Sequence, residues 1–130
     1  MMRLFFVVSL FCVGCAPAIG DDCGTSADCS VNGDRICDLA YPGGYCTVAG
    51  CEAGTCPDES VCVEWRFSPD RTAVTFCMAT CGGDGDCRGD YACMDETDER
   101  MLDSDGGRLA RALDGTDPTF CVGVTAPPLE

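Results

Sequence analysis

The sequence contains no histidine and no lysine, so all eight of its basic residues are arginine. Without histidine the chain lacks the usual general base of a nucleophilic triad, and without lysine it cannot form a Schiff base. Beyond residue 15 there is no C-x-x-C pair, the spacing typical of thiol oxidoreductases and zinc sites. These absences predict that the protein is not an enzyme and holds no zinc.

Positive charge is also scarce, because 22 acidic residues outnumber the 8 arginines and give a formal net charge of −14. Nucleic acids and anionic lipid surfaces are bound through lysine and arginine, so we expect no nucleic-acid partner. The acidic surface has two remaining interpretations. It keeps the protein soluble, or it attracts a cation or a cationic partner.

Cysteine, by contrast, is abundant, with 14 residues among 130. A cysteine content above about 8–10% in a short chain is typical of a disulfide scaffold, in which crosslinks replace part of the apolar core. Disulfides persist in oxidising compartments, so this composition indicates an exported protein.

The first 14 residues have the features of a signal peptide. Arg3 precedes an apolar run over residues 4–13, which is shorter than the about 20 residues that a membrane-spanning helix needs. We therefore expect residues 1–14 to direct export and to be removed.

Residues 12–15, Cys-Val-Gly-Cys, resemble the lipobox of bacterial lipoproteins, although Cys12 stands where leucine is usual. The resemblance implies cleavage before Cys15 and lipidation of that cysteine, which would hold the protein on a membrane at the outer membrane or cell surface. Residues 15–22 would then be a lipid-anchored tether with little to bury. The alternative is ordinary cleavage after Gly20, which would release a secreted protein.

With Cys15 assigned to lipid, twelve cysteines remain, and they form three sets of four with similar spacing. The chain then divides into unit 1 (23–50), unit 2 (51–80), unit 3 (81–124) and a C-terminal tail (125–130). An aromatic residue precedes the fourth cysteine of every set, which supports a repeated structure. The sets are Cys23, Cys29, Cys37 and Cys46; Cys51, Cys56, Cys62 and Cys77; and Cys81, Cys87, Cys93 and Cys121.

Unit 2 contains a predicted β-hairpin. Residues 61–67 and 72–78 have the composition and alternation of strands, and turn-forming residues separate them. Folding the hairpin about its turn places Cys62 opposite Cys77 and leaves Trp65 on an apolar face. The fold class that follows is small and disulfide-rich, with three tandem four-cysteine units, short β-hairpins and little helix.

Three further local features are predicted. A shorter hairpin in unit 1 would turn around residues 42–44, and residues 108–113 of unit 3 form a weak helical pattern. Trp65, Phe67 and Tyr41 could form an exposed binding patch, but we expect Trp65 and Phe67 to pack in the small core.

The disulfide pairing stays open, since four cysteines allow three pairings in each unit. We favour interleaved bonds, first to third and second to fourth, which tie the leading loop to both hairpin strands. A direct Cys62–Cys77 bond is the alternative, because the register places these residues within reach.

One loop of unit 3 has the residue types of a calcium site. Asp84, Asp86 and Asp95 fall at positions 1, 3 and 12 of an EF-hand-like loop, and Asp90 adds a fourth carboxylate. The pattern is incomplete, because Arg88 occupies position 5 and flanking helices are missing. A solvated acidic turn is the other interpretation, and we expect no other cofactor.

Residues 88–90 also form an Arg-Gly-Asp tripeptide between two cysteines. A cysteine-constrained loop of this kind binds integrins in disintegrins. Chance is the competing explanation, because the chain is rich in these three residue types and its cysteine framework otherwise differs.

The spacing of the cysteines, the steps Ser-Ala-Asp-Cys at 26–29 and Asp-Gly-Asp-Cys at 84–87, and the lipobox resemble the cysteine-rich lipoproteins of myxobacteria and related deltaproteobacteria. Their repeats are similar to the Dickkopf amino-terminal and EB modules. The resemblance implies a surface or secreted protein and no particular activity.

Together these features predict an exported, lipid-anchored cell-surface protein that acts as a binding or adhesion module for an unknown protein or glycan. Two alternatives remain. One is a structural envelope component without a discrete ligand, and the other is a secreted inhibitor or effector if the anchor is absent.

Overall fold

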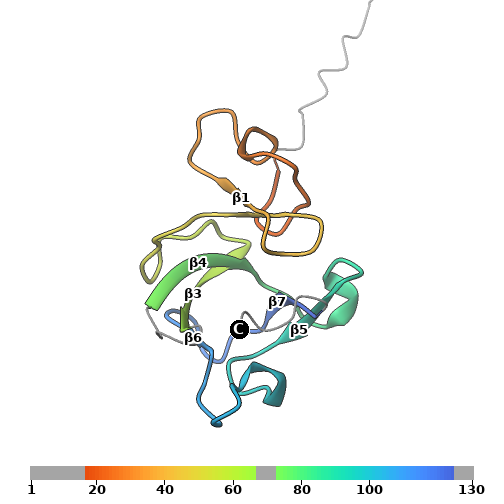
Figure 1. Ribbon diagram of the computed structural model, residues 1–130. Helices are drawn as coiled ribbons and strands as arrows, with labels where there is room; N and C mark the ends of the chain where they lie inside the picture. Colours follow the sequence, from red (N-terminus) through yellow and green to blue (C-terminus); the bar gives the residue numbers. More distant parts are fainter. Residues whose placement is uncertain (1–16, 67–72, 125–130) are drawn as a thin grey trace, which may run out of the picture.

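The computed structural model describes residues 17–66 and 73–124, so the predicted signal segment, Cys15 and Phe67 lie outside the described residues. Each unit contains one antiparallel strand pair (Figure 1). This arrangement confirms the small disulfide-rich fold, including the predicted hairpins of units 1 and 2. The pairs are β1 (Ile36–Asp38) with β2 (Tyr45–Thr47), β3 (Ser60–Arg66) with β4 (Ala73–Ala79), and β5 (Tyr91–Met94) with β7 (Phe120–Gly123).

Helix is confined to three single turns of 3-10 type among the described residues. These are η1 (Ser26–Asp28), η2 (Asp84–Asp86) and η3 (Glu99–Met101). In the part of the chain that the structure describes, no helix has the length and apolar character needed to cross a bilayer.

The third and fourth cysteines of every unit face each other across its strand pair. In unit 2 this register places Cys62 opposite Cys77 and Trp65 opposite Val74, as predicted. The alternation along β3 turns Val63 and Trp65 into the core, where they are 0% and 3% exposed. Trp65 is therefore a core residue and not part of an exposed patch.

The six disulfides follow the interleaved pairing that the sequence favours, with Cα–Cα distances of 5.4–5.9 Å. The alternative Cys62–Cys77 bond is wrong, because each of these residues bonds back to the loop that precedes the hairpin and so ties that loop to both strands. The bonds are Cys23–Cys37, Cys29–Cys46, Cys51–Cys62, Cys56–Cys77, Cys81–Cys93 and Cys87–Cys121.

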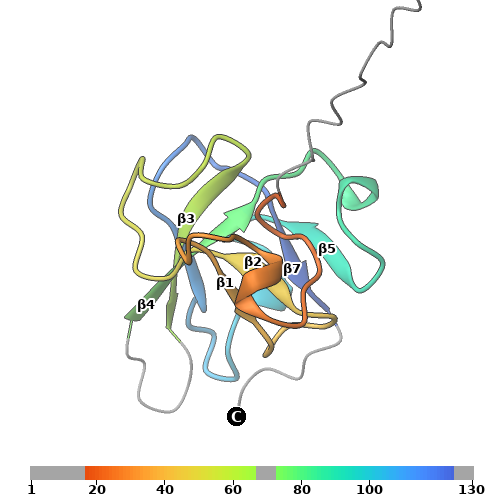
Figure 2. The ribbon, with the colours of Figure 1, turned by 90° about the horizontal axis from the view of Figure 1, so that it is seen from above.

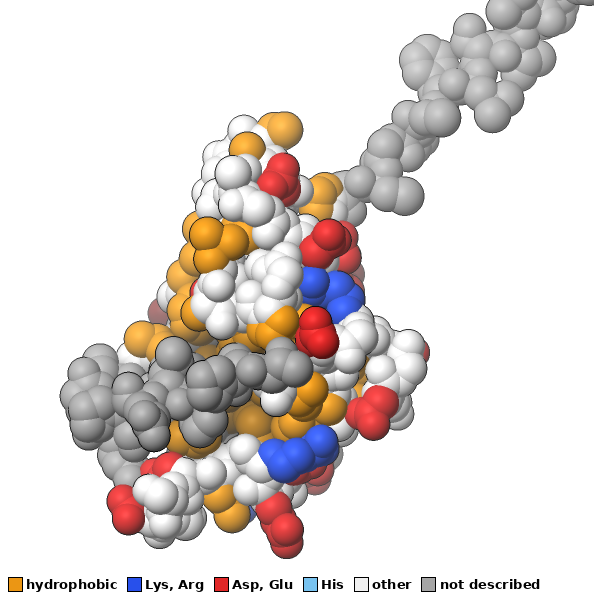
Figure 3. All heavy atoms as spheres, turned by 45° about the vertical axis from the view of Figure 1, so that its right-hand side comes forward, with side chains coloured by type: hydrophobic (Ala, Val, Ile, Leu, Met, Phe, Trp, Pro, Cys, Tyr) orange, Lys and Arg blue, Asp and Glu red, His pale blue; other side chains and the backbone are white. Residues whose placement is uncertain are grey.

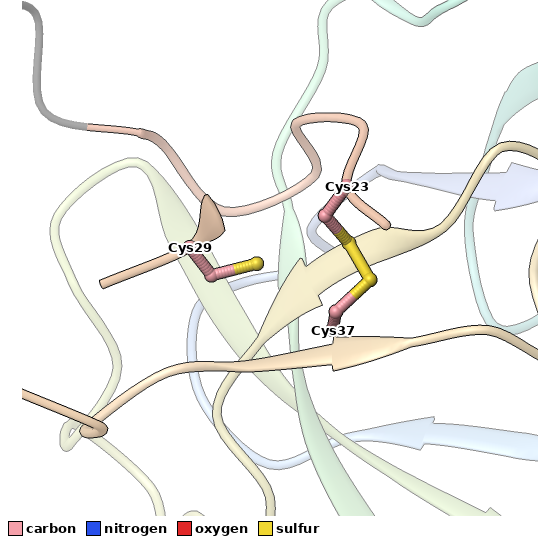
Figure 4. A group of neighbouring side chains, drawn as sticks. All are labelled: Cys23, Cys29 and Cys37. Carbon is pink, nitrogen blue, oxygen red and sulfur yellow. A yellow bond between two sulfur atoms is a disulfide. The ribbon is translucent and has the colours of Figure 1, made fainter. Parts of the chain in front are cut away.

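The two bonds of a unit lie close together. Figure 4 shows the sulfur of Cys29 pointing toward the Cys23–Cys37 bond. The Sγ atoms of these three residues lie within 4.8 Å of one another, and the equivalent cysteines of unit 2 form a similar trio. In unit 3 the trio consists of the first, second and fourth cysteines, Cys81, Cys87 and Cys121.

Unit 3 contributes a third strand to the sheet of unit 2. This strand, β6 (Ala110–Ala112), pairs with β3 and places Arg111 opposite Glu64. The helix predicted over 108–113 is therefore wrong. Six residues are too few to hold an isolated helix, and the free edge of β3 offers main-chain partners instead.

The three units share one core. Unit 1 lies above the strands of units 2 and 3 in Figure 1, and the view from above in Figure 2 shows β1 and β2 in front of the other two sheets. Isolated bridges join Ala49 to Phe76 and Thr80 to Phe120, and the Trp65 and Phe120 rings meet edge to face at 6.3 Å. Neighbouring units therefore stabilise one another through shared burial as well as through the chain.

Residues 17–22 dock on this core, although the sequence predicts a tether with little to bury. Ile19 is 3% exposed and belongs to the core cluster. The Gly20 N–H donates to the Cys46 carbonyl at 2.9 Å, and the Ile19 N–H donates to Glu59 Oε1 at 3.3 Å. Glu59 also pairs with Arg35 of unit 1 at 3.6 Å, so both neighbouring units hold this segment.

Candidate functional site

Three of the four carboxylates predicted to bind calcium accept local hydrogen bonds. Asp84 Oδ1 accepts from the Cys93 N–H at 2.9 Å, and Asp86 Oδ2 accepts from the Gly82 N–H at 2.7 Å. Asp95 Oδ1 accepts from the Thr97 hydroxyl and N–H, and these bonds lower the pKa of Asp95. The chain itself therefore uses one oxygen of each of these three carboxylates.

Unit 1 shows what the two acidic residues of η2 do. Ser26 occupies the position of Asp84 and accepts from the N–H of its own third cysteine, Cys37, at 3.1 Å. Asp28 occupies the position of Asp86 and accepts from the Gly24 N–H at 2.9 Å, which lowers the pKa of Asp28. A neutral serine performs one of these tasks, so the loop needs no ion to explain its aspartates.

Among the described residues, the only groups of three metal-ligating side chains are the cysteine trios, and their sulfurs are in disulfides. Calcium binding at Asp84, Asp86, Asp90 and Asp95 stays a prediction that would require these carboxylates to leave their present partners. The four oxygens do not converge in this structure as a calcium ion would require.

The Arg-Gly-Asp tripeptide is divided between two environments. The Arg88 guanidinium donates to the Gly44 carbonyl of unit 1 and, at 3.1 Å, to the Tyr91 hydroxyl. It also lies over the Tyr91 ring, 4.5 Å from the centroid. Asp90 is exposed, but the Arg88 side chain is held in the contact between units 1 and 3, so the tripeptide does not present both charged side chains as an integrin-type motif does.

All three tyrosines of the chain meet beneath this arginine. Tyr41, Tyr45 and Tyr91 have ring centroids 5.4–6.4 Å apart. The Tyr45 hydroxyl accepts from the Ala79 N–H at 2.8 Å, which brings unit 2 into the same junction. Burial raises the pKa of each tyrosine above its usual 10. This junction is a structural centre and offers no exposed reactive group.

A groove of about 250 Å³ lies over β3 and β6, where unit 3 joins the sheet of unit 2. Its lining is formed by charged side chains together with an apolar surface of similar extent. The residues that define it are Glu64, Arg66, Glu96, Arg108, Leu109 and Arg111.

Strand alternation and the β3–β6 pairing assemble this groove. Glu64 and Arg66 alternate with the buried Val63 and Trp65, so they point to the opposite side of β3 from the core. Arg111 lies directly across from Glu64 on β6. The groove therefore exists only because residues from unit 3 pair with unit 2.

Within the groove the acidic side chains are recessed and the basic ones project. Glu64 Oε1 pairs with Arg66 at 2.9 Å, and the two side chains are 18% and 52% exposed. Glu96 Oε1 pairs with Arg108 at 3.3 Å, with exposures of 24% and 59%. Arg111 is exposed and makes no ion pair with a described residue. The groove therefore presents guanidinium groups to an approaching ligand.

Sequence reasoning missed the groove because the strand that completes it was predicted as a helix. The sequence signal that could have indicated the strand is the alternation of small apolar and charged residues at Ala110, Arg111 and Ala112. In the structure these residues are buried, exposed and partly buried. Three residues are too few for that pattern to outweigh the helical interpretation.

Comparison with known proteins gives no relative: no family model, no curated protein and no solved structure matches the chain. The resemblance to cysteine-rich lipoproteins of myxobacteria therefore stays a prediction.

Proposed function

We propose that the chain is an exported surface protein, anchored through a lipid on Cys15, whose disulfide-linked head binds a ligand in the β3–β6 groove. Export is supported by the cysteines. Every cysteine in the described residues is in a disulfide, and such bonds persist in oxidising compartments. Cys12 and Cys15 alone remain outside this set, within or next to the predicted signal peptide.

The docked segment supports cleavage before Cys15 over cleavage after Gly20. Cleavage after Gly20 would remove Ile19 from the core and Gly20 from its hydrogen bond to Cys46. Burying one isoleucine side chain stabilises a fold by about 1.5–3 kcal/mol. A mature chain that begins at Cys15 keeps these contacts, whereas one that begins at Asp21 loses them.

The groove is the observation that carries the binding function. Three of the chain's eight arginines line it, although the protein has a net charge of −14. Concentrated cationic side chains on an acidic protein favour a ligand site over a purely structural surface. On the face shown in Figure 3, acidic side chains are scattered over the surface and the few basic side chains lie apart from one another.

The anchor is tested by the intact mass of the full-length protein expressed with its own leader in a bacterium that acylates lipoproteins. We expect a mature chain that starts at Cys15, carries acyl mass and gains about 12 Da on reduction, two hydrogens for each of six disulfides. Cys15→Ala should remove the acyl mass and release the protein from the membrane fraction. An unmodified chain that starts at Asp21 would overturn the anchor and make a secreted inhibitor or effector the better hypothesis.

A further inference from the structure

We propose that the β3–β6 groove recognises an acidic peptide segment of a partner protein, with Arg111 as the principal contact to a carboxylate. This inference rests on the proposed binding function and names the chemistry of the ligand. The three groups that carry it are Arg66, Arg108 and Arg111, which line one groove.

The guanidinium groups have unused hydrogen-bonding capacity. A guanidinium carries five N–H donors in a planar fork that matches a carboxylate. Arg66 uses Nε and Nη2 on Glu64, and Arg108 uses Nη1 on Glu96. Arg111 makes no side-chain hydrogen bond or ion pair with a described residue. It therefore has its whole fork available for a bidentate contact with a carboxylate.

The local charge favours an anion despite the acidity of the whole protein. Counting the described residues, two carboxylates and three guanidiniums line the groove, which gives it one excess positive charge. Glu96 is further occupied by the Ala112 N–H, which donates to its Oε2 at 2.8 Å. A second carboxylate on the ligand could also bond to the free donors of Arg66 and Arg108 while each keeps its own glutamate.

The size and lining favour a peptide over a saccharide. A volume of about 250 Å³ is below the roughly 300–1,000 Å³ of sites for larger small molecules, and it fits one or two side chains. Among the described residues, no aromatic ring lines the groove to stack on a sugar. The partly buried Leu109 instead supplies an apolar surface against which the methylene groups of a glutamate can pack.

The net charge of −14 makes the test specific. Long-range electrostatics repel an acidic peptide from this protein, so non-specific attraction cannot produce binding. The probe is fluorescein-labelled hexaglutamate, titrated with the full-length mature protein in low salt and followed by fluorescence anisotropy. Hexaglutamine and an oligogalacturonate serve as comparison ligands.

We expect saturable binding of hexaglutamate, no binding of hexaglutamine and weaker binding of the oligogalacturonate. Arg111→Gln should weaken hexaglutamate binding by about tenfold or more, as expected for the loss of a charged hydrogen-bonding partner. The affinity of Arg111→Lys for hexaglutamate should lie between those of the wild-type and Arg111→Gln proteins, because lysine keeps the positive charge but lacks the planar set of N–H donors. Arg100→Gln is the matched control, since Arg100 is also exposed but pairs with Asp98 outside the groove.

Three results would overturn the inference. These are no saturable binding of hexaglutamate, equal binding by the Arg111→Gln and wild-type proteins, or tighter binding of the oligogalacturonate than of the peptide. The mass gained by each variant on reduction and its thermal unfolding midpoint verify that the disulfides and the fold are intact before its binding is compared. Failure of hexaglutamate to bind would not affect the proposal of a lipid anchor, because the anchor is tested separately by intact mass. It also leaves open ligand binding at another face of the head.

Discussion

The carboxylate of Asp114 accepts a hydrogen bond from the main-chain N–H of Cys62, 52 residues earlier in the chain, at 3.0 Å. In units 1 and 3 the N–H of the third cysteine bonds instead to a side chain of the unit's own leading loop, Ser26 or Asp84. The corresponding position of unit 2 is Ala53, which has no acceptor. Unit 3 therefore supplies through Asp114 the oxygen that unit 2 lacks.

Asp114→Ala should destabilise the protein by about 1–3 kcal/mol, because the Cys62 and Gly54 N–H groups both lose a charged acceptor. Guanidinium denaturation with the disulfides intact measures this change. Asp58→Ala is the control, since Asp58 is exposed and its side chain makes no hydrogen bond with a described residue. Adding Ala53→Ser should recover part of the loss by restoring a local acceptor. An Asp114→Ala protein as stable as the control would contradict this account.

Arg88→Gln should destabilise the protein by about 2–4 kcal/mol, because it removes charged hydrogen bonds to Gly44 and Tyr91 and the contact with the Tyr91 ring. Asp90→Glu should leave stability unchanged, since Asp90 is exposed. The two variants can be compared by thermal unfolding. If Arg88 served only as part of an adhesive tripeptide, neither substitution would change the midpoint.

Cys46→Ser should yield a mixture of disulfide isomers. The released Cys29 thiolate lies within 4.8 Å of both sulfurs of the Cys23–Cys37 bond. It can bond to either sulfur and displace the other as a thiolate, so the free thiol becomes distributed over residues 23, 29 and 37.

The mixture can be measured by acid quenching, alkylation in denaturant and peptide mapping. The double variant Cys29→Ser with Cys46→Ser is the control, and it should keep the Cys23–Cys37 bond alone. If the alkylating label is found only on Cys29 in the Cys46→Ser variant, no thiol–disulfide exchange occurs.

Tyrosine ionisation should be suppressed in the native protein near pH 10. Burial raises the pKa of Tyr41, Tyr45 and Tyr91, so folding favours their neutral forms. Their contribution to stability is complete below pH about 10, the unfolded pKa, and is lost as the pH rises through the folded values. Absorbance at the tyrosinate band should therefore rise together with unfolding in alkali. A native protein that ionises all three residues with an ordinary pKa of 10 would rule this out.

The repeat, the hairpins and their register could be predicted from the sequence because these features are local. Cys62 lies opposite Cys77 because alternation over two adjacent strands leaves one register that buries the apolar face. The interleaved disulfides follow from the same local geometry. The residue before the second cysteine of each unit also makes a local contact. Its side chain accepts a hydrogen bond from the main-chain N–H of the residue after the first cysteine. These acceptors are Asp28, Thr55 and Asp86.

The contacts between units could not be predicted in this way. Arg88 has the same local context in an adhesive loop as in a buried junction, and its partner Gly44 is 44 residues away. Arg111 belongs to a strand only because β3 has a free edge for it. The candidate groove depends on this pairing between units, so the pattern within any one unit does not predict it.

The docked segment at residues 17–22 determines how far the protein could reach from a membrane. If Cys15 carries the acyl chains, Ala16 alone separates it from Pro17, whose carbonyl accepts a hydrogen bond from Arg35. A head on a long flexible linker would sweep a wide volume around its attachment point. This head would instead stand upright on the lipid surface with unit 1 nearest to it. The β3–β6 sheet lies beyond unit 1 in Figure 1, so unit 1 would hold it away from the lipid surface. Capture would then depend on a partner coming to the surface, and neighbouring copies would present their grooves in one common plane.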